Sequence, residues 1–297
     1  MTNKYYIQWI VLLVTWTCAF SQENKGVGDL RNRDIEDSTK VHNPWQQADG
    51  SILISPYISH YSTSTFRDSE GNKSNFSSDG QYSNYNPRVY LAIPILSDRL
   101  NLIASIPYFS SKYEDDNLSL KNQDIGDIEI GGRFNITNFN ENFLMGALIA
   151  YIPAYSNSQE PYAGYQLFGL ESRLILGGTL KFLGDYNNFH KVEAGVRYFF
   201  PDDPFQLRFL VSEGFRITDR FLLLGELEAM FSFSNNNEFI ASNLQSIAQY
   251  KMIKASFNLG YDFSPNFSLY GGFFHDVYNR NSAIGSGYQV FAVLRIN

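Results

Sequence analysis

The sequence predicts an all-β protein, a transmembrane antiparallel β-barrel of about 12 strands of the type found in the bacterial outer membrane. From residue 51 onward, apolar residues recur with a period of two in segments of about 9 to 16 residues, which is the length of tilted membrane strands. Turn-rich gaps separate these segments. The chain starts with a short apolar run of the export type, and no later stretch approaches the ~20 consecutive apolar residues of a transmembrane helix.

The N-terminus carries the features of a cleaved secretory signal. Lys4 precedes an apolar run from Ile7 to Phe20, which ends in the pattern Ala19-Phe20-Ser21. We expect cleavage after about Ser21, which makes residues 1–21 a signal peptide. A lipoprotein would need a small residue directly before Cys18, where Thr17 stands, so lipidation is not expected. Cleavage removes the single cysteine, so a closed hydrogen-bonded sheet or a large core must stabilise the mature chain.

Residues 22–50 differ from the rest of the chain because they are polar and charged and show no apolar period. We interpret them as a flexible periplasmic N-terminal arm, and a plug that enters the barrel lumen is the alternative. Residues 51–297 then form the barrel. The net charge of −7 and the lack of a basic tract in the sequence argue against nucleic acid as a partner.

The run from residue 220 shows the strand pattern clearly. Phe221, Leu223 and Leu227 share one face, whereas Glu226 and Glu228 share the other, so one face suits lipid and the other can hold charge. Twelve such segments occur, an even number as single-chain bacterial barrels require. The segments are 51–62, 83–96, 100–112, 125–137, 142–154, 166–183, 189–200, 205–217, 220–233, 245–262, 267–278 and 287–296.

The gaps between the segments alternate in kind. Tight turns such as Thr218-Asp219 alternate with mostly longer polar loops such as Thr63–Gly80, Tyr113–Asp124 and Asn279–Gly285. In this barrel class the short turns lie in the periplasm, and both chain ends here fall on the short-turn side. Aromatic residues near the strand ends predict two interfacial girdles. These are Phe143, Phe189, Phe221 and Phe267 on the turn side, and Tyr108, Tyr151, Tyr198, Phe200 and Phe231 on the loop side.

A soluble secreted β-sandwich is the competing fold. Strands in globular proteins average only about 5–6 residues, and the outward face of a sandwich strand is polar. Here the segments are about twice that length, and the charged and aliphatic residues occupy opposite faces. We therefore favour the barrel.

Two neighbouring segments carry a family resemblance. The first ends in Ile106-Pro107-Tyr108, and the second contains Gly126-Asp127, with Gly131, Arg133 and Phe134 behind it. They resemble the outer-membrane family named for the MetA pathway of phenol degradation, which pairs an IPY strand with a GDhxhGxKY strand, where h is apolar. Arg133 and Phe134 replace the commoner Lys and Tyr. The resemblance covers about 35 residues strongly, and it implies an outer-membrane channel or transporter for small molecules, hydrophobic ones among them.

If the aliphatic face meets lipid, the opposite face places charged side chains in the lumen. The functional interpretation is a channel whose inward charges, with cations in excess, attract anionic or polar solutes. The alternative is that these charges pair across neighbouring strands, because ~8–12 strands leave little open space and buried charges need partners. The predicted solute-binding, lumen-facing residues are Arg88, Asp127, Glu129, Arg133, Glu171, Arg173, Lys191, Glu193, Arg197, Arg208, Glu226 and Glu228. Lys181, Arg216, Lys254 and Arg295 are expected on the same face.

A catalytic site is not predicted. Of the four histidines, His190 and His275 fall on the lipid-facing parity and His42 lies in the arm. His60 lacks the His-Ser-Asn-Gly surroundings of outer-membrane phospholipase A, a barrel enzyme that uses a nucleophile beside a base. Glu213 also falls on the predicted lipid face, which indicates a register error, a bulge or an interface position.

The sequence likewise predicts no metal or cofactor site. Clustered Cys and His residues and calcium-loop patterns do not occur in it, and the acidic run Glu114–Asp116 is interpreted as a solvated loop tip. The pairs Gly131-Gly132 and Gly177-Gly178 lie inside strands with no helix following, so they indicate kinks or close approach of backbones rather than phosphate loops.

Three function classes follow, in order of preference. The first is passive passage of a small hydrophobic or anionic solute across the outer membrane, with outer-membrane lipid and the solute as partners. The second is a structural or recognition barrel whose outer loops, rich in Ser, Asn and Tyr, engage a partner. The third is a lipid-modifying enzyme.

Overall fold

The computed structural model describes residues 51–96, 99–139, 142–181, 187–201, 204–235 and 248–296. The predicted signal peptide and the predicted N-terminal arm lie outside the described residues.

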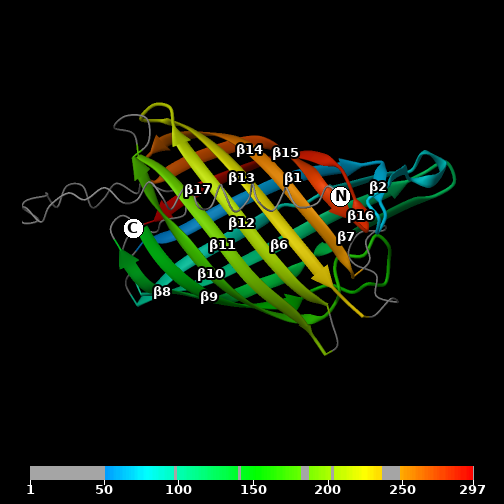
Figure 1. The fold of residues 1–297 in the computed structure, drawn as a ribbon, viewed down its shortest axis with the longest axis horizontal. Helices are drawn as coiled ribbons and strands as arrows, with labels where there is room; N and C mark the ends of the chain where they lie inside the picture. Colours follow the sequence, from blue (N-terminus) through cyan, green and yellow to red (C-terminus); the bar gives the residue numbers. More distant parts are fainter. Residues whose placement is uncertain are drawn as a thin grey trace, which may run out of the picture. The chain divides into compact units, whose positions relative to one another are not determined.

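A single antiparallel sheet closes on itself to form a barrel (Figure 1). Its strands occupy twelve positions, because β4 and β5 share one position and β7 and β8 share another. The first strand pairs with the last, from Ile52 opposite Ile296 to Ser62 opposite Ser286. The predicted barrel of about twelve strands is therefore confirmed. Its strands are β1 (Ile52–Thr63), β4 (Gln81–Tyr85), β5 (Arg88–Leu96), β6 (Leu100–Glu114), β7 (Ser119–Ile125), β8 (Asp127–Phe139), β9 (Asn142–Pro153), β10 (Phe168–Lys181), β11 (Asn187–Phe200), β12 (Phe205–Arg216), β13 (Phe221–Phe233), β14 (Tyr250–Ser264), β15 (Phe267–Arg280) and β17 (Ser286–Ile296).

The side-chain alternation divides the barrel into an outward and an inward face. Leu148, Leu174 and Phe273 point outward and are 57%, 55% and 61% exposed. Their neighbours along the strands point inward, and near the short-turn end Phe189 and Leu222 are fully buried there. An apolar outside around a mixed inside is the pattern that the period of two predicts.

Three predicted loops contain strands. The loop Thr63–Gly80 contains β2 (Thr65–Arg67), β3 (Lys73–Asn75) and the 3-10 helix η1 (Ser77–Asp79). β2 pairs with both β3 and β16 (Ser282–Ala283), so a small sheet forms at the long-loop end (Figure 1). In the loop Tyr113–Asp124, β6 continues to Glu114 and β7 begins at Ser119. Periodicity missed these strands because they are short or polar on both faces.

Pro107 lies in β6, and the strand positions on both sides of β6 are interrupted. The chain leaves the ladder at Asn86-Pro87 between β4 and β5, and at Gly126 between β7 and β8. The amide N of Tyr108 donates to the Pro87 carbonyl at 2.7 Å, and the amide N of Gly126 donates to the Pro107 carbonyl at 2.8 Å. Proline supplies no N–H to a ladder, so the interruptions lie where the backbone donors are missing.

The prediction of the aromatic girdles is wrong for three residues. Phe143, Phe189 and Tyr151 point inward, where Phe189 is 0% and Tyr151 is 3% exposed. Phe221, Phe200 and Tyr108 point outward and are between 40% and 42% exposed. Nearness to a strand end therefore does not predict that an aromatic side chain faces outward, because the alternation of side chains along the strand sets the face.

Candidate functional site: the barrel interior

The barrel interior holds two adjoining cavities. The first has a volume of about 500 Å³ and the second about 410 Å³, and both lie within the usual range for ligand sites. Residues that line both include Tyr57, Ser59, Met252 and Lys254, so the two cavities meet. The second cavity is lined by the long-loop ends of the strands, and the first extends from it toward the short-turn end.

One wall of the interior carries a network of ion pairs centred on Glu171 of β10. Its carboxylate is fully buried and lies 2.6 Å from Arg173 Nη2, 2.7 Å from Arg197 Nη2 and 3.6 Å from Arg208 Nη1. The Tyr151 hydroxyl also donates to Glu171 Oε2 at 2.8 Å. Arg197 is the ladder partner of Glu171 on β11, and its guanidinium lies 3.8 Å from the centre of the Tyr151 ring. The strand register and the side-chain alternation therefore place Glu171 next to these partners.

The network continues around the wall in both directions. Arg173 also reaches Glu193 Oε2 at 3.0 Å, and Lys191 Nζ lies 3.0 Å from Glu193 Oε1. On the other side, Glu228 of β13 lies 3.1 Å from Arg208 and 2.7 Å from Lys254 of β14. The ion pairs thus extend over five consecutive strands, β10 to β14.

This network has one property that bears on function. It joins five cations to three carboxylates, so it carries two positive charges in excess. Its members are between 0% and 28% exposed as side chains. Buried charges of this kind are retained when they are paired and hydrogen-bonded. On this wall the inward charges therefore pair across neighbouring strands, which is the alternative that the sequence left open.

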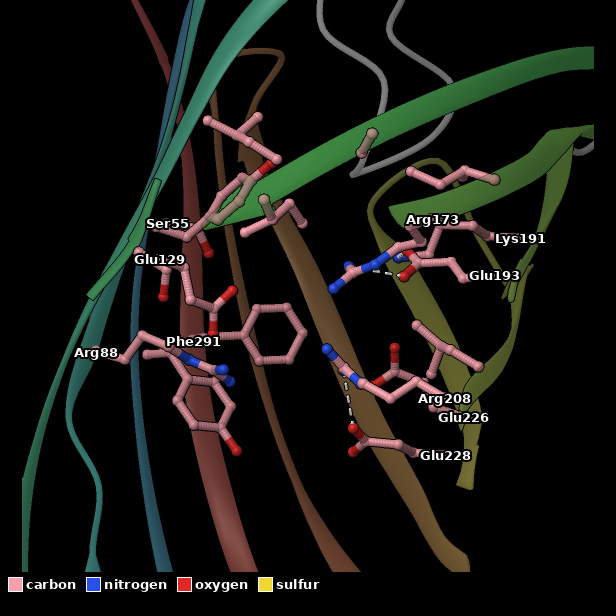
Figure 2. A pocket seen from close by; sticks show the side chains of 18 of the residues that line it. Ser55, Arg88, Glu129, Arg173, Lys191, Glu193, Arg208, Glu226, Glu228 and Phe291 are labelled. Atoms are coloured by element: carbon pink, nitrogen blue, oxygen red, sulfur yellow. Dashed lines mark hydrogen bonds and ion pairs between the residues drawn. The ribbon is translucent and has the colours of Figure 1, made fainter. Parts of the chain in front are cut away.

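The opposite wall differs, as Figure 2 shows, because its charges lie apart from the network. Arg88 of β5 lies over the ring of its ladder partner Tyr57, with Cζ 4.5 Å from the ring centre. Glu129 of β8 lies on the same side of the first cavity. Within the described residues, neither Arg88 nor Glu129 forms an ion pair. Both are therefore available to a molecule in the cavity.

Apolar and neutral polar groups complete the lining of the first cavity. Phe143, Met145, Ile175 and Phe291 supply the apolar part. The Tyr57 hydroxyl donates to Gln289 Oε1 at 2.9 Å, which holds that ring in place beneath Arg88. The cavity therefore offers an arginine and a glutamate beside an apolar surface.

The second cavity includes a loop that sequence periodicity did not place. Between β9 and β10, Tyr165 packs edge-on to Phe199 with ring centres 4.9 Å apart, and its hydroxyl accepts from Gln206 Nε2 at 3.2 Å. In the same loop the Tyr155 hydroxyl donates to Asp127 Oδ1 at 3.0 Å. Burial raises the pKa of Tyr155, so it remains a hydrogen-bond donor at physiological pH. Nothing in the pattern of a polar loop indicates that it folds inward.

The structure places the predicted lumen-facing residues as follows. Nine of them line the first cavity, two line the second, and Glu171 lies in the wall beneath its arginine partners. The nine are Arg88, Glu129, Arg133, Arg173, Lys191, Glu193, Arg208, Glu226 and Glu228, and the two are Asp127 and Arg197. Of the further cations, Lys254 joins the network and Arg216 lies 2.7 Å from Asp262, whereas the Lys181 side chain lies outside the described residues.

The histidines of the described strands show no catalytic arrangement. The His60 ring stacks on Tyr288 at 5.0 Å, and His190 and His275 point outward. No hydrogen bond joins any of these three to a serine or a carboxylate among the described residues. In the same part of the chain, no group of three or more His, Cys, Asp or Glu side chains could hold a metal ion. No helix within the described ranges is long and apolar enough to span a membrane.

Comparison with known proteins shows the fold. No family model and no characterised relative matches the sequence. The COG4313 outer membrane channel from Pseudomonas putida F1 matches with a TM-score of 0.67 at 13% identity, over 83% of this chain and 96% of that chain. The transport unit of the autotransporter AIDA-I from Escherichia coli gives 0.50 at 10% identity, over 91% and 93%. The translocator domain of the autotransporter NalP from Neisseria meningitidis gives 0.49 at 10% identity, over 83% and 89%. The likeness to the Pseudomonas putida channel and to the AIDA-I transport unit shows a closed antiparallel barrel, and the MetA-pathway resemblance stays a prediction.

Proposed function

We propose that this protein is an outer-membrane channel for small solutes that combine an apolar part with a charged group, anionic ones above all. The observation that carries the proposal is the first cavity, in which Arg88 lies outside the ion-pair network and beside an apolar surface. The excess positive charge of the opposite wall adds to the attraction for an anion.

The outward face supports a location in a membrane. Exposed apolar side chains lie on strands all around the barrel, and Leu148, Leu174 and Phe273 are more than half exposed. In water such a continuous apolar surface would aggregate, whereas lipid covers it. The predicted export signal and the barrel fold shared with the Pseudomonas putida channel point to the outer membrane.

Electrical recording from the purified barrel in planar bilayers tests the proposal. We expect conductance steps with anion selectivity, because the unpaired guanidinium and the excess charge of the network favour anions. The variant R88E should shift the selectivity toward cations. The matched variant K251E changes an exposed residue at the start of β14, and it should leave the selectivity unchanged. If the wild-type protein gives no conductance steps and liposomes that carry it take up no solute, the proposal fails.

A recognition barrel is the second candidate, and the small sheet of β2, β3 and β16 is the observation that favours it. The sheet is hydrogen-bonded to the barrel, since the hydroxyl of Thr63 in β1 donates to the carbonyl of Thr65 in β2 at 3.0 Å. Replacement of residues 65–79 by a short Gly-Ser linker separates the two functions. A channel keeps conducting, whereas a recognition protein loses its partner in a pull-down assay.

A further inference from the structure

Two ionisable side chains lie on the outward face of the barrel wall. His190 of β11 and Glu213 of β12 are direct ladder partners, and the register between these strands has no shift. They share parity with Val196, Phe209 and Phe215, which point outward and are 41% to 45% exposed. Of the three explanations that the sequence left open for Glu213, a register error and a bulge are therefore wrong. In β10 to β13, the other outward side chains that the structure describes carry no charge.

Neither member of this pair has a partner in the described structure. The His190 side chain takes part in no hydrogen bond or ion pair with a described residue, and its Nδ1 atom is covered by its own chain. Glu213 takes part in no hydrogen bond or ion pair with a described residue. Ionisable groups on a lipid-facing surface are costly and rare, and they are retained where another group satisfies them. Something outside this barrel is therefore expected to supply that group.

The surroundings of the pair leave room for close approach. Gly178 of β10 is the ladder partner of His190, and Gly225 of β13 is the ladder partner of Glu213. A Cβ atom added at Gly225 would meet no atom within 4 Å. The row Gly178, His190, Glu213 and Gly225 therefore crosses four strands with small residues at both ends. Small residues around polar ones are typical of interfaces inside membranes, because they let two backbones come close.

We propose that this row is the contact surface for a second copy of this chain. Two barrels in one membrane are related by a twofold axis along the membrane normal, and such an interface brings residue i against j and j against i. His190 of one copy then meets Glu213 of the other, twice. An acid faces a base in both contacts, so each carboxyl and each imidazole gains the hydrogen-bond partner that it lacks within one chain. A homodimer fits this surface because the pair is complementary to itself.

The proposal rests on the membrane location of the proposed function and does not depend on solute passage. Flotation of the protein with liposomes tests the location separately, so failure of insertion and failure of dimerisation give different results. The dimer is measured by energy transfer between two labelled populations of the full chain reconstituted in the same vesicles, at several ratios of protein to lipid.

Three variants decide the matter. H190E places Glu against Glu, and E213H places His against His, so each alone should weaken dimerisation at least tenfold. An equal mixture of the H190E and E213H proteins restores complementary contacts and should recover energy transfer between the two. The matched control H275E adds an acid to the outward face on β15, away from the row, and should dimerise as the wild type does.

A fourth variant separates the polar contact from the space beside it. G225W fills the open space without a clash inside its own chain, and it should block dimerisation while the barrel still folds and inserts. The proposal is overturned if the wild type stays monomeric in vesicles at every ratio. It is also overturned if H190E, E213H and G225W all dimerise like the wild type, since a lipid headgroup would then be the better partner for the pair.

Discussion

The two halves of the barrel wall hold inward charge in different ways. From β10 to β14, eight charged side chains form a continuous network around Glu171, Glu193 and Glu228, and the registers of these strands show no shift. From β1 to β8, the strands are interrupted at Asn86-Pro87 and at Gly126, and Arg88 and Glu129 stand outside any ion pair described here.

This difference between paired and unpaired charges shows that an inward charge by itself does not indicate a solute site. A charge that is paired across a regular ladder has its hydrogen bonds satisfied by the wall, and its main role is to hold neighbouring strands together. A charge that lies beside an interrupted ladder and faces a cavity keeps its capacity for a ligand. The comparison therefore assigns scaffolding to one half and solute contact to the other.

The strongest test removes the centre of the network. E171Q leaves three arginines around a neutral side chain in a buried site, so it should lower the free energy of unfolding by about 3–5 kcal/mol. Urea unfolding of the barrel in lipid vesicles, followed by far-ultraviolet circular dichroism, measures the change.

The matched control for that test is E226Q. Glu226 accepts from the Ser212 and Ser256 hydroxyls at 3.0 and 3.4 Å, and it belongs to no ion pair in the described ranges. Its amide variant should cost about 1 kcal/mol, the size of one hydrogen bond. Equal losses in E171Q and E226Q would show that the network does not stabilise its half of the wall.

The second test concerns the interrupted half, where two adjacent glycines have different surroundings. A Cβ at Gly131 would overlap the Leu148 carbonyl oxygen and lie 2.8 Å from the Ile149 Cα, so backbone must move. A Cβ at Gly132 would lie 3.6 Å from Leu100 Cδ1, an ordinary contact. G131A should therefore cost about 1–3 kcal/mol, whereas G132A should change stability by less than about 0.5 kcal/mol. The same unfolding assay measures both, and equal effects would mean that β8 and β9 do not approach closely.

The sequence predicts the two faces of this wall well and the differences between its halves poorly. Alternation assigned Glu171, Arg197 and Glu228 to the interior, because the strand period is fixed by backbone geometry. It could not tell that these residues pair whereas Arg88 does not, since pairing depends on which strands become neighbours and in which register. The sequence of a single strand does not determine its neighbours or its register.

Other features lie beyond a periodic pattern for the same reason. The inward loop that carries Tyr155 and Tyr165 has a polar sequence like any exposed loop, and only its contacts with Asp127 and Gln206 reveal its place. Pro107 removes a ladder donor, but the periodic pattern did not predict an interruption from it. That the neighbouring positions are interrupted beside it follows from the registers alone.

The sharpest separation of the two halves is expected for R88Q and E129Q. Neither residue has an ion-pair partner among the described residues, so loss of either charge should change the free energy of unfolding by less than about 1 kcal/mol. The ratio of anion to cation permeability should nevertheless fall in R88Q and rise in E129Q, because both side chains line the first cavity. Reversal potentials in a salt gradient measure that ratio. An R88Q barrel that unfolds as easily as E171Q while keeping its selectivity would assign Arg88 to the scaffold and remove the distinction between the two halves.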